Sequence, residues 1–313
     1  MAKTVIVLGN GFDLSLGLPT SYRSLVESSQ FLEEVEKGNI LAQFLKKSAK
    51  NTSNWCGFES DLLRYTKLGE HNYDSLYSDY ISLKEAIKAY YLYVNNNFTC
   101  RPSIGSDVLF NYYTRHLQAK NGELLIINFN YTNSAKRVIN NSLGRRAVKL
   151  LMFVEFIDEI GDIYSAFTGE QFNPNLKHIR VIHPHGTVED DIIFGVNDNA
   201  DMGDFIFLKK SAAKSYRPNF NWNDLNSSTE IIFYGHSLGE TDHQYFNDFF
   251  FQQADINATP QKMVFYYYGE TERLKLMKEL DTLTCQRLGS LQMNNDILFF
   301  DSSDTNYEIT HKF

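Results

Sequence analysis

The segment GHSLG, residues 235–239, fits the pattern G-x-S-x-G, which exposes the nucleophilic serine of many hydrolases on a sharp turn between a strand and a helix. In such an enzyme Ser237 would attack an acyl carbon, and Asp301 and His311 follow it in the order acid, then base. His311 is third from the end of this sequence, where terminal residues are commonly poorly held. The pattern therefore allows acyl transfer without requiring it.

The residues after this motif favour a ligand-binding loop. Thr241 and Asp242 are good helix N-caps, so we expect the next helix to begin near residue 242. Ser237 would then lie in a loop before the helix, whose first amides would point at an anionic or hydroxyl-rich group. Asp242 is expected to lie close to the same ligand.

A glycine turn near the start of the sequence indicates a nucleotide site. Gly9-Asn10-Gly11 begins like the dinucleotide fingerprint G-x-G-x-x-G, in which backbone amides approach a pyrophosphate. Leu14 stands where the third glycine belongs. Asp13 would repel a phosphate, so we expect it to accept a hydrogen bond from a ribose hydroxyl or to cap the backbone. The alternative is a turn that only leads a strand into a helix.

A second polar segment, NFNYT at residues 128–132, offers amide groups. The two-residue period of an extended chain puts Asn128 and Asn130 on one face, and Phe129 and Tyr131 on the other. These amides could bind a ligand, or they could satisfy nearby backbone groups, as asparagine often does at the ends of strands.

The third polar segment, HPHG at residues 183–186, offers a base. Two histidines one residue apart could bind a metal, but no third ligand stands out nearby, and we predict no metal site. Pro184 fixes the backbone, and Gly186 would let a ligand come close. An imidazole at the mouth of a pocket can act as a general base near neutral pH. A purely structural role is the alternative, favoured more for His183 than for His185.

These polar segments follow apolar runs that are typical of buried parallel strands. Strands alternate with helical patterns, which predicts a single α/β domain over residues 1–313, with a Rossmann-like, mainly parallel sheet. Ligands bind at the carboxyl ends of strands in such sheets. Strands or strand-to-loop units are predicted at residues 5–8, 123–132, 148–164, 178–186, 191–198, 230–242, 262–269 and 296–301.

A long segment between the first two strands has helical spacing. Residues 22–118 show no clear strand, and their apolar side chains recur at steps of three and four, as in Leu76, Tyr80, Leu83 and Ile87. We therefore predict a helical insertion or cap over residues 22–118.

Composition limits the classes of function. The 313 residues include 30 Lys and Arg against 38 Asp and Glu, a formal net charge of -8. That balance argues against nonspecific binding to nucleic acid or to anionic membranes. No apolar run approaches the ~20 residues that span a bilayer. Three widely spaced cysteines suit a reducing compartment, so we expect a cytoplasmic protein.

The polar segments, taken together, resemble the motifs of the AbiH family, bacterial proteins linked to abortive infection by phage. The matching blocks are IVLGNGFDLSLGLPTSY, INFNYT, IHPHG with IIFG, and YGHSLGETDHQYF, in the family's order and over about residues 9–246. The first block contributes Thr20 and Tyr22 to the predicted binding residues. The resemblance implies a role in phage defence, with a phage trigger that the sequence does not name.

A more distant similarity is to sirtuin-like NAD-binding domains, which carry a G-A-G loop, a T-x-N-x-D strand end, a His-Gly pair and a G-x-S loop. Asn130 matches the catalytic asparagine of that pattern, His185 and Gly186 match the pair, and Gly235 and Ser237 match the last loop. Sirtuin-like enzymes of phage defence hydrolyse NAD and lack the zinc module. The similarity implies a sirtuin-like Rossmann fold, with NAD as substrate or ligand.

The resulting hypothesis is that the protein binds and hydrolyses NAD or a related nucleotide at the N-glycosidic bond, without a further cofactor. Asn130 would position the nicotinamide ribose and a water molecule, and His185 would be the general base. Asn128 and Thr132 replace the flanking Thr and Asp of sirtuins, which leaves the identity of the nucleotide open. The alternatives are a serine hydrolase, and a nucleotide sensor or partner-binding module. The helical segment could make homo-oligomer contacts.

Overall fold

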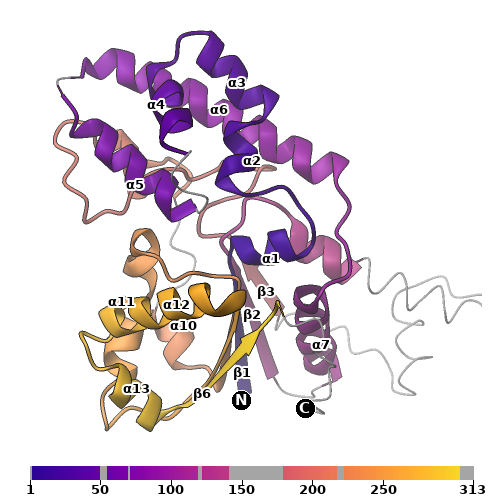
Figure 1. The fold of residues 1–313 in the computed structure, drawn as a ribbon. Coiled ribbons are helices and arrows are strands. Elements are labelled where there is room, and N and C mark those ends of the chain that lie inside the picture. Colours follow the sequence, from indigo (N-terminus) through magenta and orange to yellow (C-terminus); the bar gives the residue numbers. More distant parts are fainter. Residues whose placement is uncertain are drawn as a thin grey trace, which may run out of the picture.

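The computed structural model describes residues 2–49, 55–69, 71–118, 122–140, 179–216 and 222–303. Its centre is a six-stranded sheet in the order β3-β2-β1-β4-β5-β6, and every pair of neighbouring strands is parallel (Figure 1). The predicted α/β fold with a Rossmann-like parallel sheet is therefore confirmed.

The strands coincide with most of the predicted ones. They are β1 (Ala2–Leu8), β2 (Gly122–Asn128), β3 (Ile179–Ile182), β4 (Glu230–Tyr234), β5 (Lys262–Tyr267) and β6 (Asp296–Asp301). The β structure predicted at residues 148–164 lies outside the described residues.

The strand predicted at residues 191–198 is wrong. This segment makes only isolated bridges, between Gly186 and Ile192 and between Val196 and Lys209. Its apolar side chains are buried because they pack into the core beneath the helices, not because the backbone joins the sheet. An apolar run indicates burial, and here burial occurs without strand pairing.

Helices cover both faces of the sheet (Figure 1). One face carries α10 (Trp222–Asn226), α11 (His243–Gln253), α12 (Gly269–Leu283) and α13 (Leu288–Asn294), and the other carries α1 (Asn10–Ser15) and α7 (Ile104–Gln118). Alternation along β1 divides the core accordingly. Val5 and Val7 join the cluster under α11, whereas Ile6 and Leu8 join the cluster under α1 and α7.

A layer of helices lies over the carboxyl ends of the strands (Figure 1). It consists of α2 (Tyr22–Val26), α3 (Ser29–Glu36), α4 (Ile40–Ser48), α5 (Trp55–Thr66) and α6 (Tyr73–Asn97). The N-cap side chains of α2, α3, α4 and α6 each accept a hydrogen bond from a backbone amide in the first turn, which fixes where these helices begin. The predicted apolar face of α6 is buried.

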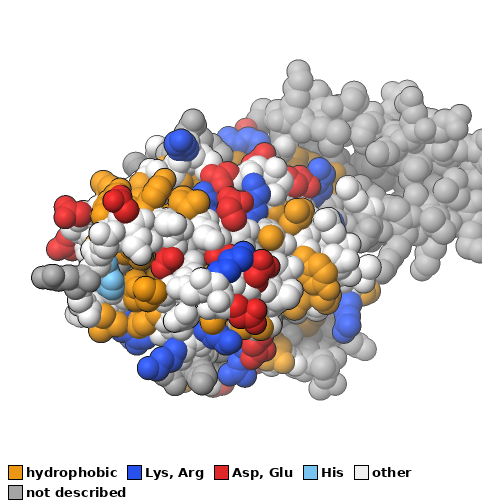
Figure 2. Space-filling model, turned by 90° about the horizontal axis from the view of Figure 1, so that it is seen from above, with side chains coloured by type: hydrophobic (Ala, Val, Ile, Leu, Met, Phe, Trp, Pro, Cys, Tyr) orange, Lys and Arg blue, Asp and Glu red, His pale blue; other side chains and the backbone are white. Residues whose placement is uncertain are grey.

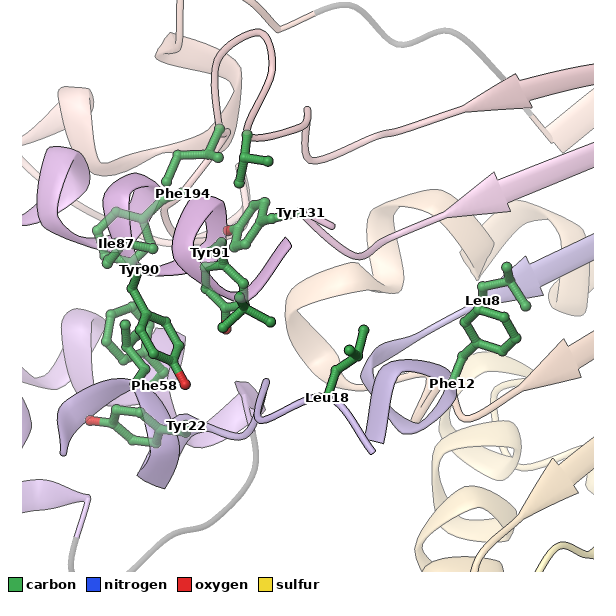
Figure 3. Close-up of a cluster of buried hydrophobic side chains, with 14 of the residues drawn as sticks. Leu8, Phe12, Leu18, Tyr22, Phe58, Ile87, Tyr90, Tyr91, Tyr131 and Phe194 are labelled. Carbon is green, nitrogen blue, oxygen red and sulfur yellow. The ribbon is translucent and has the colours of Figure 1, made fainter. Parts of the chain in front are cut away.

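One continuous apolar cluster joins this helical layer to the sheet (Figure 3). It extends from Leu8 and Phe12 beside the sheet to Phe58 and Tyr22 in the helical layer. The rings of Tyr91 on α6 and Tyr131 after β2 pack with centroids 5.3 Å apart. The helices are therefore held against the strand ends by shared side-chain packing.

The face seen from above, over the helical layer, carries acidic and basic side chains interspersed with apolar ones (Figure 2). Among the described residues, no helix combines the length and apolar character needed to cross a membrane.

Candidate functional site

A cavity of about 230 Å³ lies at the carboxyl ends of the strands. All four predicted polar segments contribute to its wall, so residues far apart in the sequence meet there. Asn130 and His185, the two predicted catalytic residues, both line it. The lining residues are Gly9, Asn10, Gly11, Asp13, Leu14, Glu59, Tyr91, Phe129, Asn130, Tyr131, His185, Gly235, His236, Ser237, Thr241, Asp242 and Glu272.

Two predicted binding residues, Thr20 and Tyr22, lie away from the cavity, in the packing of the helical layer. Tyr22 is fully buried, its ring packs edge-on against Phe58, and its hydroxyl donates to the carbonyl oxygen of Leu45 at 2.9 Å. The carbonyl oxygen of Thr20 accepts a hydrogen bond from the Tyr91 hydroxyl at 3.3 Å. Both residues hold the helical layer together.

Two further predicted binding residues, Asn128 and Gly186, have backbone roles beside the cavity and do not line it. The side chain of Asn128 is buried and accepts a hydrogen bond from the Asn130 amide at 3.0 Å. Gly186 has a φ of 70°, and a Cβ there would lie 1.9 Å from the carbonyl oxygen of Asp191. Glycine is required here because the backbone at Asp191 passes too close to leave room for a side chain.

The glycine turn after β1 packs against the loop after β4. A Cβ at Gly9 would lie 2.5 Å from the Cα of His236, and one at Gly11 would lie 2.6 Å from the Cα of Gly235. The amide of Gly9 donates to Tyr234 and that of Gly11 donates to Gly235, at 3.1 and 2.9 Å. These two amides are engaged within the protein, so in this conformation they do not form the pyrophosphate cradle expected from the sequence.

The segment after β2 brings three consecutive side chains to the cavity. Phe129, Asn130 and Tyr131 all line it, so the predicted alternation of faces is wrong. The reason is that the extended chain ends at Asn128, and the two-residue period ends with it. The Nδ2 of Asn130 donates to the carbonyl oxygen of Gly9 at 3.1 Å, which fixes the side chain.

Asp242 lies between two imidazoles. Its Oδ1 is 3.2 Å from Nε2 of His185, and its Oδ2 is 3.5 Å from Nε2 of His236. The Nδ1 of His236 accepts a hydrogen bond from the Leu238 amide at 3.1 Å, so the neutral ring carries its hydrogen on Nε2, toward Asp242. Burial lowers the pKa of His236 to about 4, which keeps that ring neutral.

A fully buried lysine, which the sequence analysis did not identify, joins this group. The Nζ of Lys210 lies 2.9 Å from Oε1 of Glu59 and 3.0 Å from Oδ1 of Asp242, and it donates to the carbonyl oxygen of Thr241 at 3.1 Å. Burial raises the pKa of Glu59, against the opposing effect of Lys210. Burial acts in the same direction on Asp242, but the Lys210 and His185 charges outweigh it and lower that pKa. No sequence pattern marks Glu59 or Lys210, because their roles arise only when α5, the segment around Lys210 and the loop before α11 come together.

Asp13, in the cavity wall, has one carboxyl oxygen that is hydrogen-bonded and one that, within the described chain, is not. Its side chain is 1% exposed, and its Oδ2 accepts a hydrogen bond from the Thr132 hydroxyl at 2.6 Å. Its Oδ1 has no partner of normal hydrogen-bond geometry among the described residues. Burial raises the pKa of Asp13 to about 6, although nearby hydroxyls favour the charged form.

Ser237 lies in a loop, as predicted. A short 3₁₀ helix, η4 (Glu240–Asp242), follows it, and α11 begins at His243 with Asp242 as its N-cap. The other predicted triad members are not at this site. Asp301 ends β6, two strands from β4, and accepts a hydrogen bond from the Gly269 amide at 3.0 Å. His311 lies outside the described residues.

His183 and His185, the two histidines of HPHG, do not form part of a metal site with other described residues. The Nδ1 of His183 lies 3.3 Å from the carbonyl oxygen of Asn130, and burial lowers the pKa of this ring. Within the described ranges, no group of three or more His, Cys, Asp and Glu side chains is placed to hold a metal ion.

Comparison with known proteins assigns the chain to a family. The family model described as bacteriophage abortive infection AbiH matches residues 5–267, a span that includes every lining residue of the cavity except Glu272. No curated protein matched the sequence. Because the family match extends over most of the 313 residues, the chain belongs to the bacteriophage abortive infection AbiH family.

Proposed function

We propose that this AbiH protein acts in abortive infection by binding NAD, or a related nucleotide, and hydrolysing the N-glycosidic bond to its nicotinamide. The observation that supports this most is that Asn130 and His185 share one cavity at the carboxyl ends of parallel strands, where ligands bind in such folds. The pair is also the one that the similarity to sirtuin-like domains singles out.

Asn130 is suited to position the ribose. Its Nδ2 is fixed on Gly9, and its Oδ1 has no protein donor among the described residues. That oxygen is available to accept a hydrogen bond from a ribose hydroxyl or from the attacking water. Because the side chain is already held at one end, little rotamer freedom remains to be lost when the ligand binds.

His185 is suited to remove a proton. Asp242 lies 3.2 Å from Nε2 of its imidazole, where a carboxylate stabilises the imidazolium that proton uptake creates. In the reaction, the C–N electron pair leaves with nicotinamide and a water oxygen bonds to the ribose carbon. The proton of that water goes to His185.

The charges of the wall suit this chemistry as well. Cleavage of the C–N bond develops positive charge on the ribose, and fixed carboxylates stabilise such charge in a site with little water. Asp13 and Asp242 both line the cavity and are buried there.

The test is product identification. Purified full-length protein is incubated with NAD, alone and with extract of phage-infected cells, and the products are separated. Nicotinamide with ADP-ribose identifies the N-glycosidic bond, whereas nicotinamide mononucleotide with AMP would place the cut at the pyrophosphate and contradict the proposal. NAD that stays intact at high protein concentration in both conditions would also contradict it. In that case, NAD binding without turnover would support the sensor alternative.

Matched variants connect the activity to the cavity. Asn130→Ala should abolish nicotinamide release, while Asn257→Ala, which changes an exposed asparagine outside the cavity, should leave it unchanged. Likewise, His185→Gln should abolish nicotinamide release. His71→Gln should leave it unchanged, because the ring of His71 packs against Tyr65 in the helical layer.

A further inference from the structure

We infer that the cavity is a subsite for a positively charged heteroaromatic ring, an N-alkylated pyridinium such as the nicotinamide ring of oxidised NAD. The inference rests on the proposed function, because it names the part of the substrate that this cavity would take. It adds that recognition depends on the positive charge of the ring, and that the phosphates remain outside.

The charged residues of the lining are all acidic. Asp13, Glu59, Asp242 and Glu272 line the cavity, and the described lining residues include no lysine or arginine. Cations contact these carboxyl groups from outside the lining: Lys210 is shared between Glu59 and Asp242, and Lys275 pairs with Glu272. The wall therefore offers carboxyl groups to an occupant of the cavity, and its described residues offer no ammonium or guanidinium group.

Asp13 adds an independent indication of a missing partner, since one of its oxygens stays unpaired among the described residues although the charge of Arg137 acts on this carboxyl group. Its side chain is 1% exposed, it lines the cavity, and its Oδ1 lacks a partner of normal geometry among the described residues. A buried carboxylate oxygen without a partner is costly to the fold. A cation in the cavity would reduce that cost, so the protein's own energetics favour an occupant of positive charge.

Aromatic residues also contribute to the wall. Tyr91, Phe129 and Tyr131 line the same cavity, and Phe129 packs edge-on against the rings of His185 and His236. Aromatic faces attract cations through their quadrupole, and aromatic pockets are a common way to bind quaternary ammonium groups. Carboxylates together with aromatic rings therefore match a flat organic cation better than they match an anion or an uncharged sugar.

The cavity is poorly suited to phosphate. The amides of Gly9 and Gly11, which would have formed the anion site, donate to carbonyl groups of the β4 loop. Its volume of about 230 Å³ is also below the roughly 300–1,000 Å³ of sites for whole drug-sized ligands. A ring with its sugar fits this description better than a complete dinucleotide does.

The experiment compares two probes that differ in charge. Binding of 1-methylnicotinamide, a pyridinium cation, and of neutral nicotinamide to the full chain is measured by calorimetry or by NMR titration at pH 7.5. We expect the cation to bind at least about tenfold more tightly, a difference of about 1.4 kcal/mol. Equal affinity, or tighter binding of nicotinamide, would overturn the inference.

Variants separate charge from the extra methyl group. Asp13→Asn should bring the affinity ratio of the two probes toward one, because it removes the charge and keeps an acceptor for Thr132. Glu272→Gln, at a half-buried position of the lining that also pairs with Lys275, should reduce the ratio less. Asp255→Asn, an exposed position outside this cavity, should leave the ratio unchanged.

The outcomes distinguish this inference from the proposed function. A ratio that both Asp13→Asn and Glu272→Gln leave unchanged would overturn the cation subsite even if NAD is cleaved. A charge-dependent ratio without nicotinamide release would support the subsite and contradict hydrolysis. If Asp13→Asn does not fold, the Glu272→Gln ratio decides the question, because that substitution leaves the core intact.

Discussion

His185 and Asp242 meet in the cavity, with Nε2 of the imidazole 3.2 Å from Oδ1 of the carboxylate, although the two residues follow different strands. The pair depends on the parallel sheet, which brings the segments after β3 and β4 to the same edge. It also depends on Lys210, because this second positive partner acts with His185 to keep Asp242 charged.

Lys210→Met should therefore destabilise the fold strongly. The substitution removes a buried ammonium and leaves Glu59 and Asp242 close together without their shared counter-charge, a loss expected to cost about 3–5 kcal/mol of unfolding free energy. Urea titration at pH 7 measures the change, with the exposed Lys67→Met as control, expected within about 0.5 kcal/mol of wild type. A Lys210→Met variant as stable as the control would contradict this account of the buried group.

Substitutions at two glycines distinguish the destabilising effect of steric crowding from that of backbone strain. Gly235 and Gly269 both have positive φ, at 61° and 74°, but a Cβ at Gly235 would lie 2.5 Å from backbone atoms of Gly11, whereas nothing lies within 4 Å of one at Gly269. Gly269→Ala should cost about 1 kcal/mol, and Gly235→Ala several times more, because the two cavity loops must separate. Thermal unfolding of both variants checks the order, and equal losses would mean that the loop contact is unimportant for stability.

Asp13 should make stability depend on pH in a definite direction. Its folded pKa of about 6 lies above its ordinary value of 3.8, so the folded state retains a proton that the unfolded state has lost between these values. Wild-type stability should thus fall relative to Asp13→Asn as the pH rises from about 4 to about 6, and the difference should then level off. The rise of about 2 pKa units corresponds to about 3 kcal/mol.

Chemical denaturation of wild type and Asp13→Asn at pH 4, 5, 6 and 7 measures this difference directly, and other titrating groups largely cancel. If the stability of the wild type relative to Asp13→Asn stays constant over this range, or increases as the pH rises, Asp13 is charged in the fold at all these pH values.

Ser237 should be dispensable for nucleophilic chemistry. Its side chain lines the cavity, but the predicted acid, Asp301, lies at the end of β6 and is bound to the Gly269 amide. A fluorophosphonate probe should not label the protein, and Ser237→Ala should release nicotinamide within about tenfold of the wild-type rate. Labelling that disappears in Ser237→Ala would instead favour the serine hydrolase.

The fold was largely predictable from the sequence because strong local patterns of apolar residues indicate where its strands and helices lie. The apolar run of β1 and the three- and four-residue spacing along α6 report burial directly, and both elements are found. Residues 191–198 misled the prediction because burial against helices and burial within a sheet select the same side chains.

The cavity was predictable only in part. Polar residues after strands marked Asn130 and His185, since the carboxyl ends of parallel strands share one edge of a sheet. Glu59 and Lys210 carry no such mark, because their contact joins α5 to a segment far along the chain. The pattern of the glycine turn suits both phosphate binding and loop packing, and the structure shows the packing of this turn against the loop after β4.

The most direct test of the central claim is the time course of nicotinamide release from NAD by the wild-type chain and by Asn130→Ala and His185→Gln. The variants are first shown to unfold like the wild type, and activity is measured with and without infected-cell extract. We predict release by the wild type, and a fall of about a hundredfold or more in each variant. Intact NAD with the wild-type protein in both conditions, or release that neither substitution reduces, would contradict the account.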